Sequence, residues 1–344
     1  MMRTVLNAAS SVVGNALLGP RGVKPIFPLY HITPFCNLRC SYCDGFPELG
    51  LTRETGWEIR ERDRSRYELD THGVRELLRI LRKRFDALFL SGGEPLVRDD
   101  IEEVCEYACE IGFRVISLNT NGLLLDEKES VLRSISHLVF SLDALDEQDS
   151  PRTAGAADGV FARILENFGR CLGLRERYGF RLVVHSVIQP GRLAVAEEVL
   201  RSCVSRGIDV CLSPLHHKYR VDWLDGSRQA YAGLLDEIMR LKRQGASISG
   251  SHAFYENMKT METFTCAPFA IPRIIPDGRI LYPCRPRGRI GASILDAGSW
   301  ERALAETAAK YGPPRPCTDS CRIRCYVEPS LLIRKPWLVL KEIR

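Results

Sequence analysis

The sequence lacks any run of 18 or more apolar residues, so no segment is expected to span a membrane. It also lacks internal repeats, low-complexity segments and any stretch that interleaves aromatic side chains with a dense basic run, as a nucleic-acid channel would. The net charge of +5 is small for 344 residues and gives no reason to expect nucleic acid as a partner. With 45% apolar and 26% charged residues, the composition is that of a globular protein with a sizeable core.

Cysteine, by contrast, is abundant. The thirteen cysteines are odd in number and gather in two groups, unlike the cysteines of a disulfide framework. Clustered thiols indicate metal or redox chemistry. Residues 4–18 are weakly apolar but broken by polar residues, so a signal peptide is a poor interpretation, and export would expose metal-binding thiols to oxidation. We therefore expect a cytoplasmic protein.

Short β-rich runs alternate with helical patterns through most of the chain, which predicts βα units around a parallel sheet. The expected strands cover residues 29–33, 87–91, 114–119, 138–142, 181–188 and 210–214. The expected helices cover residues 74–84, 100–112, 127–134, 160–178, 194–206 and 228–244. Six such units predict an α/β fold with a partial (β/α)6 barrel rather than a complete eight-fold one.

Composition divides the chain into four expected parts. Residues 1–27 would be an N-terminal extension and residues 28–245 the barrel, in which a charged stretch near residues 46–70 has the character of a long functional loop. Proline, glycine and cysteine then increase, and Pro276-Asp277-Gly278 lies between two apolar runs, as a hairpin turn would. Residues 246–330 would form a small Cys-rich extension and residues 331–344 an apolar, basic tail.

Cys36, Cys40 and Cys43 form a C-x3-C-x2-C motif directly after the first expected strand. Three thiolates on one loop can ligate three irons of a cubane cluster and leave the fourth iron open to an exogenous ligand. On this motif alone, a zinc site is the alternative. His31 could supply its fourth ligand, although it falls inside the expected strand.

A second motif, Gly92-Gly93-Glu94-Pro95, ends the second expected strand. Active-site residues lie at this end of the strands in parallel barrels. Glycines allow the backbone to approach a ligand closely, and backbone carbonyls together with Glu94 would suit an ammonium group. Alone, this tetrapeptide predicts only a tight turn. Placed one βα unit after the cysteine motif, it favours the cluster with an open iron over zinc.

These motifs resemble those of radical S-adenosylmethionine enzymes, over about residues 29–214. The resemblance implies that Cys36, Cys40 and Cys43 hold a [4Fe-4S] cluster whose open iron is chelated by the methionine part of S-adenosylmethionine (SAM). One electron would cleave this cofactor, and a 5′-deoxyadenosyl radical would abstract hydrogen from the substrate inside a barrel that excludes water. A flavodoxin or ferredoxin would be the electron donor.

The resemblance also implies cofactor contacts. Tyr42 precedes the last cysteine of the motif, where the family has an aromatic residue beside the adenine. The turn from Gly92 to Pro95 would receive the amino group. Further residues at or near strand ends lie where family members contact the cofactor, and these are Asn119, Asn121, Ser141, Asp143, His185 and Ser186.

The second cysteine group resembles the auxiliary-cluster extension called SPASM, or its shorter relative, the twitch domain. Its members are Cys266, Cys284, Cys317, Cys321 and Cys325. The full extension has seven cysteines and two clusters, so five imply one auxiliary [4Fe-4S] cluster, held by Cys266, Cys284 and two of the last three. A structural zinc is the alternative. The remaining cysteines fit small buried hydrophobic positions, and these are Cys105, Cys109, Cys171, Cys203 and Cys211.

The expected substrate is a small molecule or a lipid, because the 35 residues before Cys36 are too few for a folded leader-binding domain. The basic aromatic loop from His216 to Arg220 is a candidate for contact with an anionic substrate, although a solvated loop has the same pattern. The apolar tail is a candidate for peripheral membrane contact or for docking on its own domain. Two alternatives stay open: a peptide maturase, and a non-enzymatic iron–sulfur or zinc protein that carries electrons.

Overall fold

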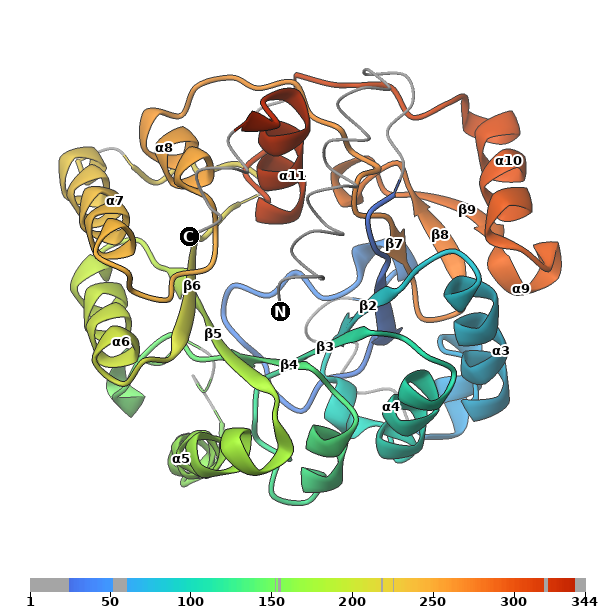
Figure 1. Cartoon of the computed structure of the whole chain (residues 1–344), viewed down its shortest axis with the longest axis horizontal. Coiled ribbons are helices and arrows are strands. Elements are labelled where there is room, and N and C mark those ends of the chain that lie inside the picture. The colour runs from blue at the N-terminus through green and yellow to red at the C-terminus, as the bar shows by residue number, and fades with distance from the viewer. Residues whose placement is uncertain are drawn as a thin grey trace. The chain divides into compact units, whose positions relative to one another are not determined.

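The computed structural model describes residues 25–51, 61–151, 153, 156–217, 219–224, 226–318 and 321–337, and side chains of residues 61–63 are not described (Figure 1). By its internal contacts the chain forms two compact units, and each is described by itself. The larger unit comprises Phe27–Val183 and Pro272–Pro313. The smaller unit comprises Met1–Ile26, Val184–Ile271 and Pro314–Arg344. The domain boundaries expected from composition stay a prediction.

A parallel sheet forms the centre of the larger unit. Its first four strands pair in sequence order, and they are β1 (Leu29–Thr33), β2 (Ala87–Gly92), β3 (Val115–Thr120) and β4 (His137–Ser141). On the other side of β1 lie β7 (Arg273–Ile274), which is parallel to it, and then the antiparallel strands β8 (Arg279–Tyr282) and β9 (Arg289–Ser293). The predicted hairpin around Pro276-Asp277-Gly278 is therefore confirmed as the β7–β8 connection.

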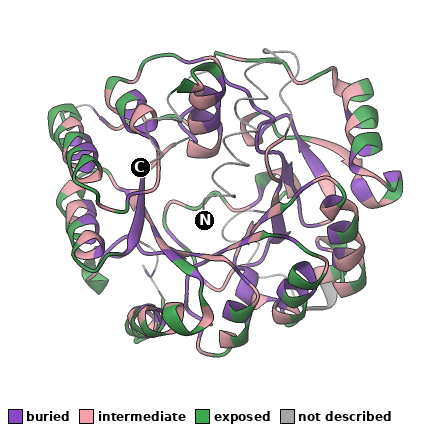
Figure 2. Cartoon of the chain, viewed as in Figure 1, coloured by how far each residue is buried: buried purple, intermediate pink, exposed green. Residues whose placement is uncertain are grey.

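Burial alternates along β2, β3 and most of β4 and so distinguishes two faces of the sheet. In β3, Ile116 and Leu118 are buried, whereas Ser117 between them is only half-buried. The register places Ser117 level with Phe89 of β2 and His137 of β4, which are half-buried as well. Side chains that are level on paired strands share a face, so the half-buried set lies on one face, here called the inner face, and the buried set lies on the other. Figure 2 colours the chain by this burial.

The helices of the larger unit carry buried residues at helical spacing. In α3 (Thr71–Arg82), one such stripe runs from Val74 to Leu81. This helix begins after Asp70, whose carboxylate accepts a 2.8 Å hydrogen bond from Gly73 N. The other α-helices are α4 (Ile101–Glu110), α5 (Val160–Tyr178), α9 (Ile294–Ala297) and α10 (Trp300–Tyr311). The 3-10 helices are η1 (Pro47–Leu49), η2 (Glu61–Arg66), η3 (Pro95–Val97), η4 (Glu129–Arg133), η5 (Glu147–Asp149) and η6 (Arg285–Arg287). The helix expected at residues 127–134 is thus the short 3-10 helix η4.

The smaller unit contains the end of β5 (Arg181–Ile188), in which the division between the units falls, and the neighbouring strand β6 (Asp209–Pro214). Its helices are α6 (Leu193–Ser205), α7 (Arg228–Arg243), α8 (His252–Thr260) and α11 (Arg324–Arg334). All six expected barrel strands are present, and the strand order is open rather than closed into a ring. The structure confirms the expected α/β class with a partial barrel.

The predicted burial of isolated cysteines is confirmed except at one position. Cys109 is exposed, because it lies on the outer side of α4, one residue after the fully buried Ala108. The other four are at most 2% exposed, and they are Cys105, Cys171, Cys203 and Cys211.

The apolar tail is partly folded onto its own unit. Its first residues end α11, where Ile333 joins a small buried cluster with Ala267 and Ala270, and Leu332 packs against that cluster. Residues 338–344 lie outside the described part of the chain, as do residues 1–24. Among the helices that the structure describes, none has both the length and the apolar character needed to cross a membrane.

Candidate functional site

The cysteine loop, residues 36–43, follows β1 directly. Cys36 is half-buried, Cys40 is buried and Cys43 is exposed. Backbone amides approach two of the sulfurs, because Leu38 N donates to Cys36 Sγ and Gly45 N donates to Cys43 Sγ, each over 3.4 Å. Such N–H···S bonds stabilise a thiolate, which is the form that ligates iron.

The thiols of the cysteine loop lie close enough to influence each other's charge. Burial is the main cause that raises the pKa of the Cys36 thiol. The negative charge of Glu94 and, to a smaller extent, charge on Cys40 and Cys43 raise this pKa further, whereas the hydrogen bond from the Leu38 amide lowers it. Three thiolates there would need a cation to offset their repulsion. Among the described residues, no group of three or more Cys, His, Asp or Glu side chains is arranged so that it could hold a metal ion. The ligand set therefore stays a prediction.

The Gly-Gly-Glu-Pro turn is joined to the segment that leads into the cysteine loop. Gly93 N donates to Thr33 O over 2.8 Å, and Glu94 N donates to Phe35 O over 2.7 Å. A Cβ atom on Gly92 would lie 2.3 Å from Thr33 O, and one on Gly93 would lie 2.1 Å from Phe35 O. The two glycines are therefore needed for the close approach of the two backbones, whatever they do toward a ligand.

Glu94 connects the ends of β2 and β3. Its side chain is 1% exposed; Oε1 accepts hydrogen bonds from Thr120 Oγ1 over 2.7 Å and from Leu96 N over 3.0 Å, and Oε2 accepts one from Asn121 N over 2.7 Å. The sequence predicted that this carboxylate receives a ligand's ammonium group. In the structure three protein donors already surround it, so its first role is to hold the strand ends together. Pro95 begins η3 immediately after it.

Asn121 reaches the cysteine loop from the end of β3. Its Nδ2 donates to Asn37 Oδ1 over 2.8 Å and lies 3.9 Å from Cys36 Sγ. The Asn37 Nδ2 atom is buried and has no hydrogen-bond partner among the described residues. A buried donor of this kind, next to a thiol, fits a site that a bound group completes.

Tyr42 links the same loop to the segment after β4. Its hydroxyl donates a 2.6 Å hydrogen bond to Asp143 Oδ2, and both Asp143 and the nearby Ser141 are buried. Asn119 is half-buried on the inner face of β3. Within the larger unit, hydrogen bonds thus join the cysteine loop to Asn121 and to Asp143, and the segment that leads into this loop to the Gly-Gly-Glu-Pro turn.

His185 and Ser186 lie in the smaller unit, on β5. His185 is half-buried, and its Nε2 is 3.4 Å from Ser213 Oγ of β6. Ser186 is fully buried, and successive strand residues point to opposite faces. The two side chains therefore cannot contact a ligand from the same face of the strand, and their roles as cofactor contacts stay predictions.

The loop after β6 is closed by a backbone bridge between His217 and Arg220. His217 N donates to Arg220 O over 2.8 Å, and Arg220 N donates back to His217 O over 2.9 Å. His217 and Arg220 are exposed, and Tyr219 between them has a φ of 69°. Lys218, which was predicted with them, lies outside the described residues.

Two of the C-terminal cysteines are backbone neighbours. Cys266 N donates to Cys317 O over 2.7 Å, and Cys317 N donates to Cys266 O over 3.4 Å, which makes an isolated antiparallel bridge. Cys321 is buried, and Cys325 lies in α11. These four belong to the smaller unit, whereas Cys284 precedes η6 in the larger one.

An arginine that the sequence did not single out anchors this cysteine segment. Arg322 is 4% exposed, and its guanidinium donates to Asn257 Oδ1 over 2.7 Å and to Met261 O over 2.6 Å. It thereby satisfies groups at the C-terminal end of α8. The anchoring fixes the position of the neighbouring Cys321.

His31 is poorly suited to be a fourth metal ligand. It is 4% exposed on β1, and its Nε2 accepts a 3.1 Å hydrogen bond from the Arg273 guanidinium. Burial lowers its pKa well below the usual value, and the positive charges of Arg273 and Arg285 lower it further. A positive potential that disfavours a proton on this imidazole also disfavours a metal cation.

Two relatives are similar to part of this chain. One, a probable GTP 3',8-cyclase of Methanothermobacter thermautotrophicus, is 35% identical over 129 residues, which cover 36% of this chain and 38% of that protein. The other, a GTP 3',8-cyclase of Aquifex aeolicus, is 30% identical over 167 residues, which cover 46% of this chain and 47% of that protein. The chain therefore spans less than half the length of these relatives.

Solved structures have a similar fold. SuiB of Streptococcus suis bound to S-adenosylmethionine matches with a TM-score of 0.52 and 15% identity over 74% of this chain and 59% of that one. The protein anSMEcpe with bound AdoMet matches with a TM-score of 0.60 and 14% identity over 92% of this chain and 99% of that one. The sequence model of the radical SAM superfamily matches residues 30–213, which is more than half of the chain. The chain therefore belongs to the radical SAM superfamily.

Proposed function

We propose that this protein is an enzyme that binds SAM at a [4Fe-4S] cluster held by Cys36, Cys40 and Cys43. It would cleave SAM reductively and modify a small-molecule or lipid substrate. The observation that carries the proposal is the hydrogen-bonded assembly of the cysteine loop, the Gly-Gly-Glu-Pro turn and Asn121 in one compact unit. When bound, the cluster supplies the electron that breaks the sulfonium bond of SAM.

The chain's own residues would bind and orient the cofactor. The backbone carbonyls of Gly92 and Gly93 would accept hydrogen bonds from the ammonium group of SAM, while Glu94 holds the turn through its bonds to Thr120 and Asn121. Asp143 holds the Tyr42 hydroxyl, so that the aromatic ring has one orientation beside the adenine. The N–H donors at Cys36 and Cys43 favour thiolates over thiols.

A second [4Fe-4S] cluster would use four of the five C-terminal cysteines. The backbone bridge between Cys266 and Cys317 supports this part of the proposal, because paired strand residues place their side chains within reach of one ion. Arg322 supports it by fixing Cys321 against α8. The cluster would transfer electrons or anchor the substrate.

Two substrate classes are candidates. A small molecule is supported by the relatives named as GTP cyclases, so GTP belongs in any substrate screen. A peptide is the second candidate, because a structure with a similar fold is SuiB bound to the precursor peptide SuiA, with a TM-score of 0.52 over 76% of this chain. A flavodoxin or ferredoxin would supply the electron.

Peripheral membrane contact is supported by one exposed aromatic side chain, Trp337, which is 57% exposed beside Arg334 and Lys335.

Anaerobic reconstitution with iron and sulfide tests the proposal. Dithionite and SAM should yield 5′-deoxyadenosine and methionine, measured by mass spectrometry. The variant Cys40→Ala should yield neither product, because the cluster loses one of its three thiolates. Cys109→Ala is the matched control, since Cys109 is exposed on α4, and it should retain the activity of the parent.

Two outcomes would contradict the proposal. One is a parent protein with full iron content that leaves SAM intact after reduction. The other is a stoichiometric zinc ion lost in Cys40→Ala and retained in Cys109→Ala, which would indicate a structural metal site. Co-sedimentation with anionic liposomes, with Trp337→Ser as the variant, tests the membrane contact separately.

A further inference from the structure

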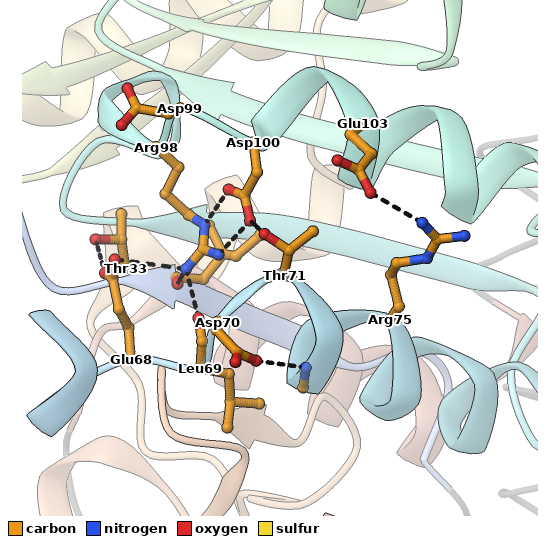
Figure 3. A network of polar contacts seen from close by, with 12 residues as sticks. Thr33, Glu68, Leu69, Asp70, Thr71, Arg75, Arg98, Asp99, Asp100 and Glu103 are labelled. Atoms are coloured by element: carbon orange, nitrogen blue, oxygen red, sulfur yellow. Dashed lines mark hydrogen bonds and ion pairs between the residues drawn. The ribbon is translucent and has the colours of Figure 1, made fainter.

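A buried network of charged groups lies beside the cysteine loop, at the end of β1. Figure 3 shows Arg98 between Glu68 and Asp100, with Thr33 and Thr71 at either end. Arg98 is 4% exposed and Glu68 is 8% exposed. None of these residues belongs to the predicted site, and Glu68 comes from the charged segment that the sequence predicts to be a long functional loop.

Each nitrogen of the Arg98 guanidinium donates a hydrogen bond. Its Nε and Nη2 donate to the two oxygens of Asp100 over 2.8 and 2.7 Å. Its Nη1 donates to Ile32 O of β1 over 3.2 Å and to Leu69 O over 3.0 Å, and it lies 3.5 Å from Glu68 Oε1. One side chain therefore ties the segment before α3 to the backbone of β1.

Glu68 extends this connection toward the cysteines. Its Oε2 accepts a short hydrogen bond from Thr33 Oγ1, and that same hydroxyl accepts a 3.2 Å bond from Phe35 N. The carbonyl of Thr33 accepts the bond from Gly93 N described above. Thr33 thus joins Glu68 to Phe35, which immediately precedes Cys36, and to the turn predicted to bind SAM.

The segment that carries Glu68 also covers Phe35. The Tyr67 ring packs edge-to-face on the Phe35 ring with 6.3 Å between centroids, and the Arg64 guanidinium lies 5.1 Å from the Phe35 centroid. Arg64 Nη2 donates to Val97 O over 3.2 Å, which joins the covering segment to η3. Phe35 is 6% exposed as a result.

Stability alone gives little reason for such a network. Replacing a buried ion network by apolar residues of similar volume is often neutral or stabilising, because desolvation of the charges offsets their attraction. Hydrogen bonds of fixed direction, by contrast, select one arrangement of the groups that they join. The groups joined here are the entry to the cysteine loop and the turn after β2.

We propose that Glu68 and Arg98 are positioning residues, which act through Thr33 to hold the cysteine loop and the Gly-Gly-Glu-Pro turn in the one register that binds SAM at the cluster. This inference rests on the proposed function. It predicts that weakening the network leaves the cluster in place but changes how SAM binds to the cluster.

The test compares isosteric variants of the reconstituted full chain. Thr33→Val removes the hydroxyl that joins Glu68 to Phe35, and Thr33→Ser retains it. Glu68→Gln removes the charge but keeps the size of the side chain, so it can still test the network if Thr33→Val does not fold. Glu103→Gln is the matched control, because it breaks the 2.9 Å Arg75–Glu103 pair between α3 and α4, which is exposed (Figure 3).

The readouts are iron content and the electron paramagnetic resonance spectrum of the reduced cluster during titration with SAM. We expect Thr33→Val and Glu68→Gln to keep their iron, to bind SAM about 10- to 100-fold more weakly, and to show an altered SAM-bound spectrum. Thr33→Ser and Glu103→Gln should match the parent. Parent-like SAM affinity and spectrum in both Thr33→Val and Glu68→Gln would overturn the inference. A parent spectrum that does not respond to SAM would instead overturn the proposed function, and this inference with it.

Discussion

The hydroxyl of Tyr42 donates a 2.6 Å hydrogen bond to Oδ2 of Asp143, although 101 positions separate the two residues in the chain. Tyr42 lies inside the cysteine motif, and Asp143 follows β4. The bond therefore fastens the cysteine loop to a strand end two strands beyond the one that carries the Gly-Gly-Glu-Pro turn. The loop is thus held at two points, by Asp143 and by Asn121.

Tyr42→Phe should change the orientation of the cysteine loop, and with it SAM binding, without changing the binding of the cluster. The variant keeps the aromatic ring but leaves the buried Asp143 carboxylate without this donor, which should lower the free energy of unfolding by about 1.5–3 kcal/mol. We expect iron content to stay the same and SAM to bind more weakly, as measured by urea denaturation, iron analysis and equilibrium binding. Tyr178→Phe is the matched control, because its hydroxyl donates to Glu129 over 3.0 Å away from the cysteine loop. Equal losses of SAM affinity in both variants would contradict the assignment.

Gly93→Ala should disrupt the turn. Its new methyl group would lie 2.1 Å from the carbonyl oxygen of Phe35, which is backbone and cannot swing aside as a flexible side chain can. We expect a protein that is insoluble or that does not retain iron after reconstitution. Gly169→Ala on α5 is the control, since no atom lies within 4 Å of its Cβ position, and it should stabilise the helix by about 0.5–1 kcal/mol. Melting temperature and iron content measure both effects.

Most of the fold could be predicted because its strands and long helices have regular patterns. The expected bounds of β1, β5 and α5 agree with the structure at both ends. Helix α8 was not predicted, because it is nine residues long and begins at a Ser251 cap inside a polar stretch. A cap of this kind stabilises a short helix that has too few turns for a periodic pattern.

The candidate site was only partly predictable. The cysteine loop, the turn and Asp143 could be identified from local motifs, and the structure joins them. Glu68 and Arg98 could not, because their contacts depend on the pairing of β1 with β2 and on the path of a segment without periodicity. The hydrogen bonds that Glu94 accepts from Thr120 and Asn121 were missed for the same reason, since they connect the ends of two different strands.

Glu94→Gln should show that this side chain stabilises the fold. The amide nitrogen would replace either Oε1, which accepts from Thr120 Oγ1 and Leu96 N, or Oε2, which accepts from Asn121 N. Either way one backbone N–H loses its acceptor. This should cost about 1–3 kcal/mol of unfolding free energy, measured by urea denaturation without SAM. Glu110→Gln, at the exposed end of α4, should change it by less than about 0.5 kcal/mol. An unchanged stability in Glu94→Gln would mean that its contacts contribute little.

His31 should make stability depend on pH. Its pKa in the folded protein is lowered by burial and by the charges of Arg273 and Arg285, so below pH 6.5 the unfolded chain binds a proton that the folded chain does not. The stability that His31 contributes is therefore fully present above about pH 6.5. It falls by up to about 1.4 kcal/mol per pH unit as the pH decreases toward the folded pKa.

The measurement is the free energy of unfolding of the parent and of His31→Gln between about pH 5 and pH 8. Glutamine does not titrate in this range, and its carbonyl can accept the hydrogen bond from Arg273 as the imidazole does. The difference between the two proteins should be constant above about pH 6.5 and should move in favour of the variant as the pH decreases. A difference between parent and His31→Gln that stays constant from pH 8 to pH 5 would show that the imidazole is protonated as readily in the folded chain as in the unfolded one. That result would restore His31 as a candidate ligand for a cation.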